Sequence, residues 1–599
     1  MILQRLAEHY DRISASGDAE SHLAAPGSSR QKISFCVVLE PDGSLNQFQS
    51  LLQKAGKQLV ATAMIVPGQG KPPGQGLNPC FLWDNASYLL GWTVDPDFEK
   101  KARAVLAFEA FRKRHVELEA QIAHPAFAAV CSFLRSWSPD QALDHAALLT
   151  EVCTNFGVFR IAGETRYVHE LVAVGAQGVE EKADDGGLST GMCLVSGVTE
   201  QIARLHEPKI KGVAGAQSMG ALLVSFNASS FESYNKSQSY NAPVGTNTAF
   251  RYANALNHLL ERRDRRVALG DSTVVFWADH PNNLERCLSE LFAEAPPDET
   301  ATVEEDKERI RQAKLLLTQL RDGTGGADIG EDGQPTKFFL LGLSPNASRL
   351  SVRLWVEADA EELKRRLGQH LRDVALEDGR EYALLTLRRI ADATGRAVRE
   401  KGKRLKFDTK ATSPQLAGDL ARSVLTGAAY PASLLATMLR RIHSDGEVAY
   451  ARVAALKACL VRNTRLRGNP LEVSVMLDRN NVDPAYCCGR SFAILEKIQT
   501  DSADGELNTT IKDRYFSSAG TTPAIVFPRL FRLNQHHLAK LEHGSRIYWE
   551  KQIGEVLSKI NLFPHLLSLE DQGKFVLGYF HQRQDLYTSK KDKTEGVVQ

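Results

Sequence analysis

The spacing of apolar residues changes near residue 357, and this change limits the folds that the chain can adopt. Beyond that point apolar residues recur at i, i+3 and i+4 in one segment after another, which is the period of an amphipathic helix. The segments are 361–371, 384–399, 414–426, 431–443, 447–461, 484–501, 528–542, 545–560 and 568–580. Because short connections favour antiparallel neighbours, the pattern predicts a helical region that ends in a bundle.

Before residue 357 the sequence mixes strand and helix patterns. Residues 33–39 form an apolar strand-like run that a Pro-Asp-Gly turn follows, and the apolar runs 338–343 and 350–355 flank a turn typical of a hairpin. The fold class that we expect is therefore α+β. Its parts are a mixed α/β N-terminal domain over 1–356, a basic helical region over 357–475 and a C-terminal helical bundle over 476–599.

Several N-terminal helices are expected from the same patterns. In the helix predicted at 96–122, the spacing of the apolar residues favours one buried face. Its residues are Phe98, Ala102, Val105, Leu106 and Phe108. Further helices are predicted at 198–206, at 246–264 and near 303–321. His206 would then lie at a helix end, where it would cap the negative end of the dipole.

Two long tracts are predicted to be loops rather than regular structure. Residues 59–80 hold four glycines and four prolines, and residues 227–245 are dense in Asn, Ser, Gln, Tyr and Lys. Side chains of these types can bond to phosphates and base edges, and tyrosine can stack on a base. The alternative is a polar surface loop without a ligand, although loops of this length are often functional.

Charge is uneven along the chain although the net charge is only +1. Residues 388–467 contain 17 lysines and arginines but 6 aspartates and glutamates. Such a local excess is typical of a surface that binds polyanions, but a set of solvated helices would give the same count.

Signals of catalysis, metal binding and membrane insertion are weak. The nine cysteines include no C-x-x-C pair, and no P-loop motif occurs. Ser218 lies in a motif like the nucleophile elbow of hydrolases, but the apolar run follows the serine instead of preceding it. We therefore expect no catalytic residue, no metal and no cofactor. No run of 18 apolar residues is present, and the sequence from Met1 is not typical of a signal peptide, so a cytoplasmic protein without membrane contact is expected.

Several blocks of sequence resemble one known family. They are Met192–Gly197, His206–Val213, Ser225–Asn227, Phe231–Val244 and Tyr252–Asn257, together with Phe81–Asn85, Tyr88–Gly91, Leu343–Arg349, Gly578–Gln584 and the start Met1–Gln4 with Tyr10. Their order and content resemble the Csd family, the large subunit of the type I-C CRISPR surveillance complex known as Cascade. The resemblance covers nearly the whole chain.

This resemblance implies a subunit of a ribonucleoprotein that carries a CRISPR RNA (crRNA). It would recognise the protospacer-adjacent motif (PAM) in target double-stranded DNA, help to open the duplex and stabilise the R-loop by holding the displaced single strand. It would also recruit a helicase-nuclease for antiviral defence. Its partners would be the backbone, crRNA-end-binding and small subunits of the complex. Reading only a short PAM while base pairing reads the sequence is a general scheme of RNA-guided recognition.

Residues for nucleic-acid binding follow from the loops and the basic segment. For the PAM duplex the candidates are Gln69, Lys71, Gln75, Asn78, Asn227, Ser233, Asn235, Lys236, Gln238 and Asn241, with Lys209, Lys211 and Lys236 neutralising phosphates. For the displaced strand they are Arg388, Arg389, Arg396, Arg399, Lys401, Lys403 and Arg404.

The family also implies that the C-terminal part is made as a separate small subunit from an internal start. Met476 is the only methionine after Met438 and precedes the helices of the bundle, so we expect 476–599 to exist as an independent polypeptide. Two other readings stay open, namely a nucleic-acid scaffold outside CRISPR and a nuclease or a hydrolase that uses Ser218.

Overall fold

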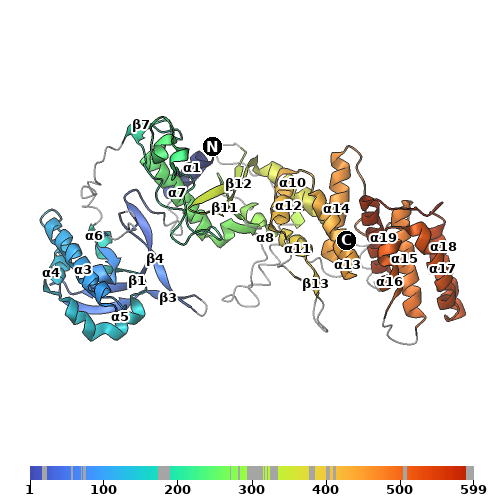
Figure 1. Ribbon diagram of the computed structural model, residues 1–599, viewed down its shortest axis with the longest axis horizontal. Coiled ribbons are helices and arrows are strands. Elements are labelled where there is room, and N and C mark those ends of the chain that lie inside the picture. Colours follow the sequence, from blue (N-terminus) through green and yellow to red (C-terminus); the bar gives the residue numbers. More distant parts are fainter. Residues whose placement is uncertain are drawn as a thin grey trace. The chain divides into compact units, whose positions relative to one another are not determined.

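The computed structural model describes most of the chain (Figure 1). The described residues are 1–16, 23–55, 58–68, 70–71, 76–172, 189–269, 272–280, 284–292, 315, 318–319, 321–323, 335–376, 385–398, 405–408, 413–503 and 509–587. Contacts divide the chain into two units. Unit 1 comprises Met1–Gly212, Ala216–Glu261 and Asn346–Leu350, and unit 2 comprises Val213–Gly215, Arg262–Pro345 and Ser351–Gln599.

Unit 1 contains a six-stranded sheet with the order β3-β4-β1-β6-β5, in which β2 also pairs with β1. The strands are β1 (Ser28–Leu39), β2 (Leu45–Ser50), β3 (Leu52–Ala55), β4 (Gln58–Pro67), β5 (Trp83–Asn85) and β6 (Phe156–Ile161). Strands β1 and β6 run parallel, and the other pairs of this sheet are antiparallel.

The second half of strand β1, residues 33–39, is apolar except for Ser34 because both of its faces are buried there. Phe35, Val37 and Leu39 join a core with helices on one face of the sheet. Cys36 and Val38 join a smaller core on the other face. The helices and helical turns of this part are α2 (Ala86–Leu90), α3 (Phe98–Leu118), α4 (Pro125–Ser136), η1 (Pro139–His145), α5 (Ala146–Val152) and α6 (Val168–Val172).

In the remainder of unit 1, the first helix of the chain packs on a helix that follows much later in the sequence. Helix α1 (Ile2–Ser16) packs on α7 (Thr246–Glu261), with Tyr10 edge-on to Phe250 and an Arg251–Asp11 ion pair of 2.7 Å. Between them in sequence lie the short strands β7 (Thr190–Met192) and β8 (Thr199–Gln201), followed by the helical turns η2 (Ser229–Phe231) and η3 (Gln238–Asn241).

Unit 2 begins with a second sheet and continues as helices. The sheet order is β12-β11-β10-β9. The elements are η4 (Arg263–Arg265), β9 (Arg266–Leu269), β10 (Ser272–Ala278), α8 (Leu284–Phe292), β11 (Lys337–Asn346), β12 (Arg349–Asp359), α10 (Ala360–Val374), α11 (Leu387–Asp392), β13 (Ala397–Val398), β14 (Lys406–Phe407), α12 (Pro414–Thr426), α13 (Ala432–Asp445), α14 (Tyr450–Leu466), α15 (Pro484–Asp501), α16 (Ile511–Ala519), α17 (Pro523–Leu538), α18 (His543–Leu557) and α19 (Leu569–Tyr587). The α+β class, the hairpin and the helical C-terminal region are thus confirmed.

Two of the predicted elements are wrong. Residues 198–206 are not a helix, because 199–201 pair as strand β8 with β7. The predicted loop 59–80 begins instead as strand β4, because its first residues pair with β1 and β3. The helix expected near 303–321 lies mostly outside the described residues.

The third error concerns the buried face of α3. Phe98 is 83% exposed, and Ala102, Val105 and Leu106 are exposed as well. The helix instead buries a face with small alanines and two phenylalanines, which fit closely against the sheet; its residues are Ala104, Ala107, Phe108, Phe111 and His115. Only Phe108 was assigned correctly.

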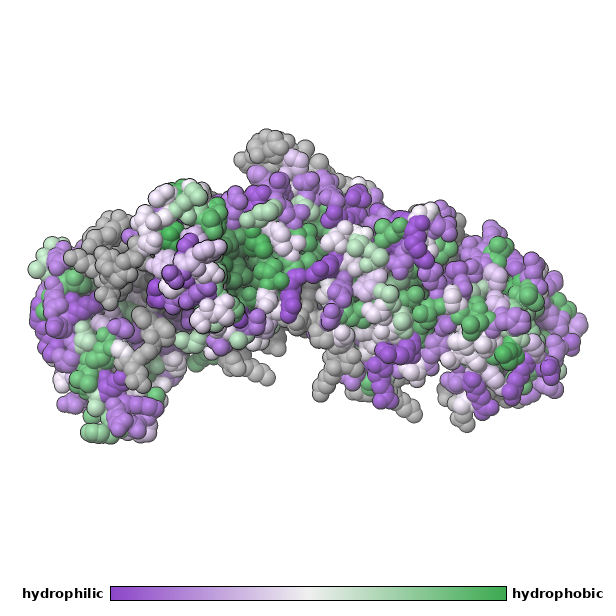
Figure 2. Space-filling view, turned by 45° about the horizontal axis from the view of Figure 1, so that its top comes forward, coloured by the Kyte–Doolittle hydropathy of each residue, from purple (hydrophilic) through white to green (hydrophobic). Residues whose placement is uncertain are grey.

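Hydrophilic and hydrophobic residues are interspersed on the face shown in Figure 2. Within the described residues, no helix combines the length and the apolar character needed to cross a membrane.

Helices α15 and α19 touch each other through their backbones. A Cβ atom on Gly489 of α15 would lie 2.0 Å from the carbonyl oxygen of Phe575, and one on Gly578 of α19 would lie 2.1 Å from that of Tyr486. These distances are far below van der Waals contact. The two glycines therefore set the closest approach of this helix pair.

Replacement of either glycine by alanine should destabilise the protein. We expect Gly489→Ala or Gly578→Ala to lower the free energy of unfolding by about 2–4 kcal/mol, because the added methyl group forces the two backbones apart. Urea unfolding followed by circular dichroism measures the change. Gly554→Ala is the matched control, since that helical glycine has open space around it and should gain up to about 1 kcal/mol. Equal unfolding midpoints for all three variants would contradict the interpretation.

Candidate nucleic-acid interface

The 227–245 loop is folded around a tight turn. The amide of Lys236 donates to the carbonyl of Ser233 at 3.0 Å, and the two central residues, Tyr234 and Asn235, have φ values of 53° and 56°. Two positive φ angles define a type I′ turn, whose central positions favour Asn and Gly. A bulky tyrosine is rare in this conformation, which costs about 1–3 kcal/mol and persists only where its surroundings enforce it.

The enforcing contacts come from two amides of the same loop. The side chain of Asn241 accepts from the Ser233 amide at 2.9 Å and donates to the carbonyls of Lys236 and Gln238 at 2.6 and 2.9 Å. The side chain of Gln238 accepts from Arg204 at 2.7 Å. Asn241 and Gln238, both predicted to contact DNA, thus already bond within the protein.

The tip of the turn points outward. Tyr234 is 94% exposed, and Ser233, Asn235 and Lys236 are also exposed. Within the described part of the chain, the side chains of Asn235 and Lys236 make no hydrogen bond or ion pair. The turn therefore offers an aromatic ring, an amide and an ammonium group together. Sequence reasoning did not select Tyr234, although an aromatic residue within a polar tract was a visible signal.

The segment that carries Lys209 and Lys211 is held by α7. The side chain of Asn257 donates to the carbonyl of Lys209 at 3.0 Å and accepts from the amide of Lys211 at 2.8 Å. The Lys211 side chain is exposed, and that of Lys209 is half-buried. Asn227, at the start of the 227–245 loop, donates to the Ser348 hydroxyl at 3.1 Å.

His206 does not cap a helix. It is buried, and its Nδ1 atom lies 2.7 Å from the hydroxyl of Tyr252 on α7. Burial lowers the pKa of His206 to about 4, so the imidazole is neutral at physiological pH. The residue anchors the segment before Lys209 to the helix.

In the first loop Lys71 has partners within unit 1. Its ammonium group lies 2.5 Å from the carboxylate of Asp84, which is fully buried, and 3.3 Å from the centre of the Tyr88 ring. Burial raises the pKa of Asp84, and the charge of Lys71 opposes that rise. Asn78 is exposed, and its carbonyl accepts from Lys71 at 2.6 Å. Gln69 and Gln75 lie outside the described residues.

Part of the positive charge in 388–467 is buried in unit 2. Helix α14 buries three cations, Arg452, Lys457 and Arg462. Arg452 donates to the carbonyls of Ala393 and Gly395 at the end of α11, and to Asp445 at the end of α13. The carbonyls lie at the negative end of a helix dipole and Asp445 carries a negative charge, and a cation stabilises both.

The other two buried cations donate hydrogen bonds near the C-terminal ends of two more helices. Lys457 donates to the carbonyls of Arg372 and Asp373 at the end of α10, at 3.2 and 3.1 Å. Arg462 donates to the carbonyl of Ser423 near the end of α12 at 3.1 Å and to the Asp373 carboxylate at 3.0 Å. The basic excess is therefore a poor guide to the surface here.

The predicted single-strand residues are only partly described. Arg388, Arg389 and Arg396 are exposed, and Arg388 lies 3.9 Å from Asp392 on its own helix. Arg399, Lys401, Lys403 and Arg404 lie outside the described residues. Their role in binding stays a prediction.

Ser218 lies in an exposed turn rather than at the end of a strand. The turn is closed by a hydrogen bond from the Gly220 amide to the Gln217 carbonyl at 2.9 Å. In the part of the chain that the structure describes, the Ser218 side chain has no hydrogen-bond partner, and no three metal-ligating side chains form a group. The geometry offers the serine no base.

A comparison with known proteins identifies the class of protein to which the chain belongs. The sequence model of the family described as CRISPR-associated protein (Cas_Csd1) matches residues 6–587. The protein is thus a CRISPR-associated protein. More particularly, the chain belongs to the Csd1 family, which confirms the resemblance found in the sequence blocks. No curated protein matches the chain.

The buried carboxylate at the centre of the α14 contacts gives a test of this arrangement. Asp373 accepts from Arg462 and, through both oxygens, from Arg465 at 2.9 Å. Asp373→Asn should lower the free energy of unfolding by about 3–5 kcal/mol, because it leaves buried cations without their counter-charge. Asp501→Asn, which breaks a partly exposed pair with Lys497, is the control and should cost less than about 1 kcal/mol. Similar losses in urea unfolding for the two variants would count against the assignment.

Proposed function

We propose that the chain is the large subunit of a type I-C CRISPR surveillance complex. In this function it recognises the PAM in double-stranded target DNA, helps to open the duplex, stabilises the R-loop and recruits the helicase-nuclease. Its partners are crRNA, the displaced strand and the backbone, crRNA-end-binding and small subunits. Family membership supports a place in a CRISPR system, and the finer roles are argued below from the residues.

The observation that carries this proposal is the tip of the 227–245 loop. A strained turn holds Tyr234 outward, and buried or internally bonded residues hold the turn. An aromatic side chain on a rigid tip can enter a base step and unstack it, and this is how several proteins distort duplex DNA. Asn235 beside it can bond to a base edge, and Lys236 can bond to a phosphate.

Lys209 and Lys211 lie in another of the sequence blocks that mark the family. Their backbone is fixed by Asn257, and their ammonium groups form no ion pair with a described residue. Lysines held in this way suit phosphate contacts, which position a protein on DNA without reading its sequence.

Substitution of Tyr234 should separate binding from stability. In the complex assembled with crRNA, Tyr234→Ala and Tyr234→Gly should weaken binding to a PAM-containing duplex by about tenfold or more, given ~1–3 kcal/mol per base–aromatic stack. Tyr234→Gly should also raise the unfolding temperature of the free chain, because glycine adopts positive φ without strain. Mobility shift and thermal unfolding measure the two effects.

The control for this test is an exposed tyrosine elsewhere. Tyr548→Ala on α18 should leave duplex binding unchanged. If Tyr234→Ala binds the PAM duplex as tightly as the wild type, the loop tip is not the opening device.

A second proposal concerns 476–599. The segment between α14 and α15 contains no helix, and Met476 within it is exposed. Helices α15 and α19 are joined by their own polar contacts, with Arg490 donating to Gln582 at 3.0 Å and the Tyr579 hydroxyl donating to Glu496 at 2.6 Å. These contacts lie wholly within residues 476–599, so the fragment keeps them.

Expression of the natural coding sequence with a C-terminal tag tests the internal start. Immunoblotting should detect the full chain and a fragment that begins at Met476, and Met476→Leu should remove only the fragment. Met438→Leu is the control and should leave the fragment in place. Persistence of a fragment of the same size in the Met476 variant would refute this start.

A further inference from the structure

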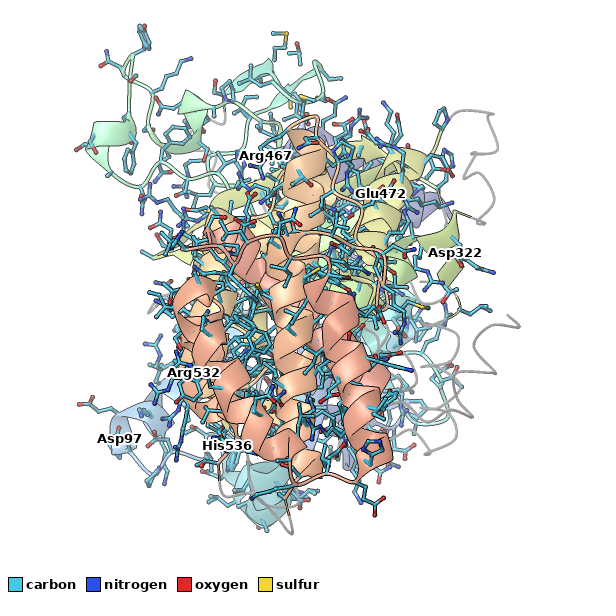
Figure 3. All side chains as sticks on the ribbon, turned by 90° about the vertical axis from the view of Figure 1, so that its right-hand side faces the viewer. Asp97, Asp322, Arg467, Glu472, Arg532 and His536 are labelled. Atoms are coloured by element: carbon cyan, nitrogen blue, oxygen red, sulfur yellow. The ribbon has the colours of Figure 1, made fainter. Side chains whose placement is uncertain are left out.

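Helix α17 carries a file of basic side chains along one exposed face. Arg529, Arg532, His536 and Lys540 are exposed and are spaced at i, i+3, i+7 and i+11, with Lys540 two residues beyond the helix end. Successive residues of a helix are turned by 100°, so these four positions fall within an arc of roughly 80°. At 1.5 Å per residue the file is roughly 16 Å long. Figure 3 labels Arg532 and His536 on this helix. We name these four residues the α17 file.

The file lacks the carboxylates that accompany other exposed cations of the bundle. Arg546 of α18 lies 2.9 Å from Glu550, and Lys497 of α15 lies 2.5 Å from Asp501. By contrast, α17 contains no Asp or Glu, and no member of the α17 file forms an ion pair with a described residue. Arg529 lies over the ring of Tyr515 at 5.4 Å. Among the described residues, therefore, no carboxylate pairs with the basic side chains of this face.

The opposite face of α17 fixes the helix in the bundle. Val526, Phe527, Leu530 and Leu538 are buried, and the Phe527 ring stacks on Phe563 at 5.0 Å. The amide of Ala524 donates to the carbonyl of Pro564 at 3.1 Å, which ties down the start of the helix. The helix that carries the file is therefore fixed in the bundle.

We infer that the α17 file binds the phosphates of single-stranded nucleic acid. A single file of cations follows one phosphate chain, whereas a duplex presents two chains across a groove about 12 Å wide. An acidic protein partner is less well matched, because protein interfaces depend on aromatic or apolar anchors, and no large apolar side chain between Arg529 and Lys540 is exposed.

This inference rests on the proposed function, in which the chain holds a displaced strand, and it adds a surface to that role. Sequence reasoning placed the displaced strand on 388–467, where three of the cations are buried against helix ends. The α17 file lies outside that segment, and α17 has too few cations to stand out in a charge count.

The test is the salt dependence of binding of a fluorescent thymidine 20-mer to the full chain. For single strands the slope of log K against log salt is about −0.7 per phosphate contact. The variant Arg529→Gln, Arg532→Gln, Lys540→Gln should therefore have a slope shallower by about 2. Between 50 and 200 mM salt the wild type should then lose about 18-fold more affinity than the variant.

The matched control removes three cations that already face carboxylates. The variant Lys497→Gln, Arg546→Gln, Arg479→Gln changes the net charge equally, and its slope should stay within about 0.5 of the wild type. Equal slopes for the α17 variant and the wild type, or equal shifts in the two triple variants, would overturn the inference.

Two further variants keep the outcome interpretable. Arg532→Gln with Lys540→Gln leaves the Arg529–Tyr515 contact in place and should still flatten the slope by about 1.4. Tyr234→Ala should leave the slope unchanged. If the α17 variant flattens the slope as expected but Tyr234→Ala binds the PAM duplex normally, only the loop proposal is rejected. If Tyr234→Ala weakens duplex binding but the α17 variant keeps the wild-type slope, only the α17 inference is rejected.

Discussion

Helix α14 supplies buried cations that form hydrogen bonds at the C-terminal ends of four other helices. The last carbonyls of α10, α11 and α12, and the carboxylate that ends α13, receive hydrogen bonds from Arg452, Lys457 or Arg462. A helix end that is buried without partners leaves carbonyl groups unsatisfied, at a large cost in free energy. The packing of this part of unit 2 therefore depends on charge that is almost entirely hidden from solvent, and burial lowers the pKa of Lys457 to about 8.

Sequence alone predicted those elements whose pattern of apolar residues has only one structural explanation. The run 33–39 is apolar because both faces of β1 are buried, and the helical region follows from a repeated period. It failed where strand pairing overrides a helical pattern, as when β7 pairs with 199–201 across a short turn. On α3 two apolar faces were available, and the period could not tell which of them meets the sheet, so Phe98 was placed in the core although it is exposed.

The candidate site could be predicted only as a tract. Composition treats every amide of 227–245 alike, whereas the structure divides them by what they bond. Asn241 holds the turn together, and Asn235 points away from it. The same hydrogen bonds that remove Asn241 from base reading keep Tyr234 in a backbone conformation that a tyrosine rarely adopts. One asparagine thus stabilises the turn while another is exposed and available to a ligand, and their spacing in the sequence does not distinguish the two.

The contrast between α14 and α17 shows why a count of charges does not locate a polyanion surface. A cation contributes to the external field only if the fold has not already neutralised it. On α14 the cations face carbonyls and Asp373, and water is excluded, so a phosphate cannot reach Arg462. On α17 fewer cations are present, but they share one exposed face and the helix has no carboxylate of its own. Neutralising an α17 cation should therefore change binding rather than folding, and the opposite holds for α14.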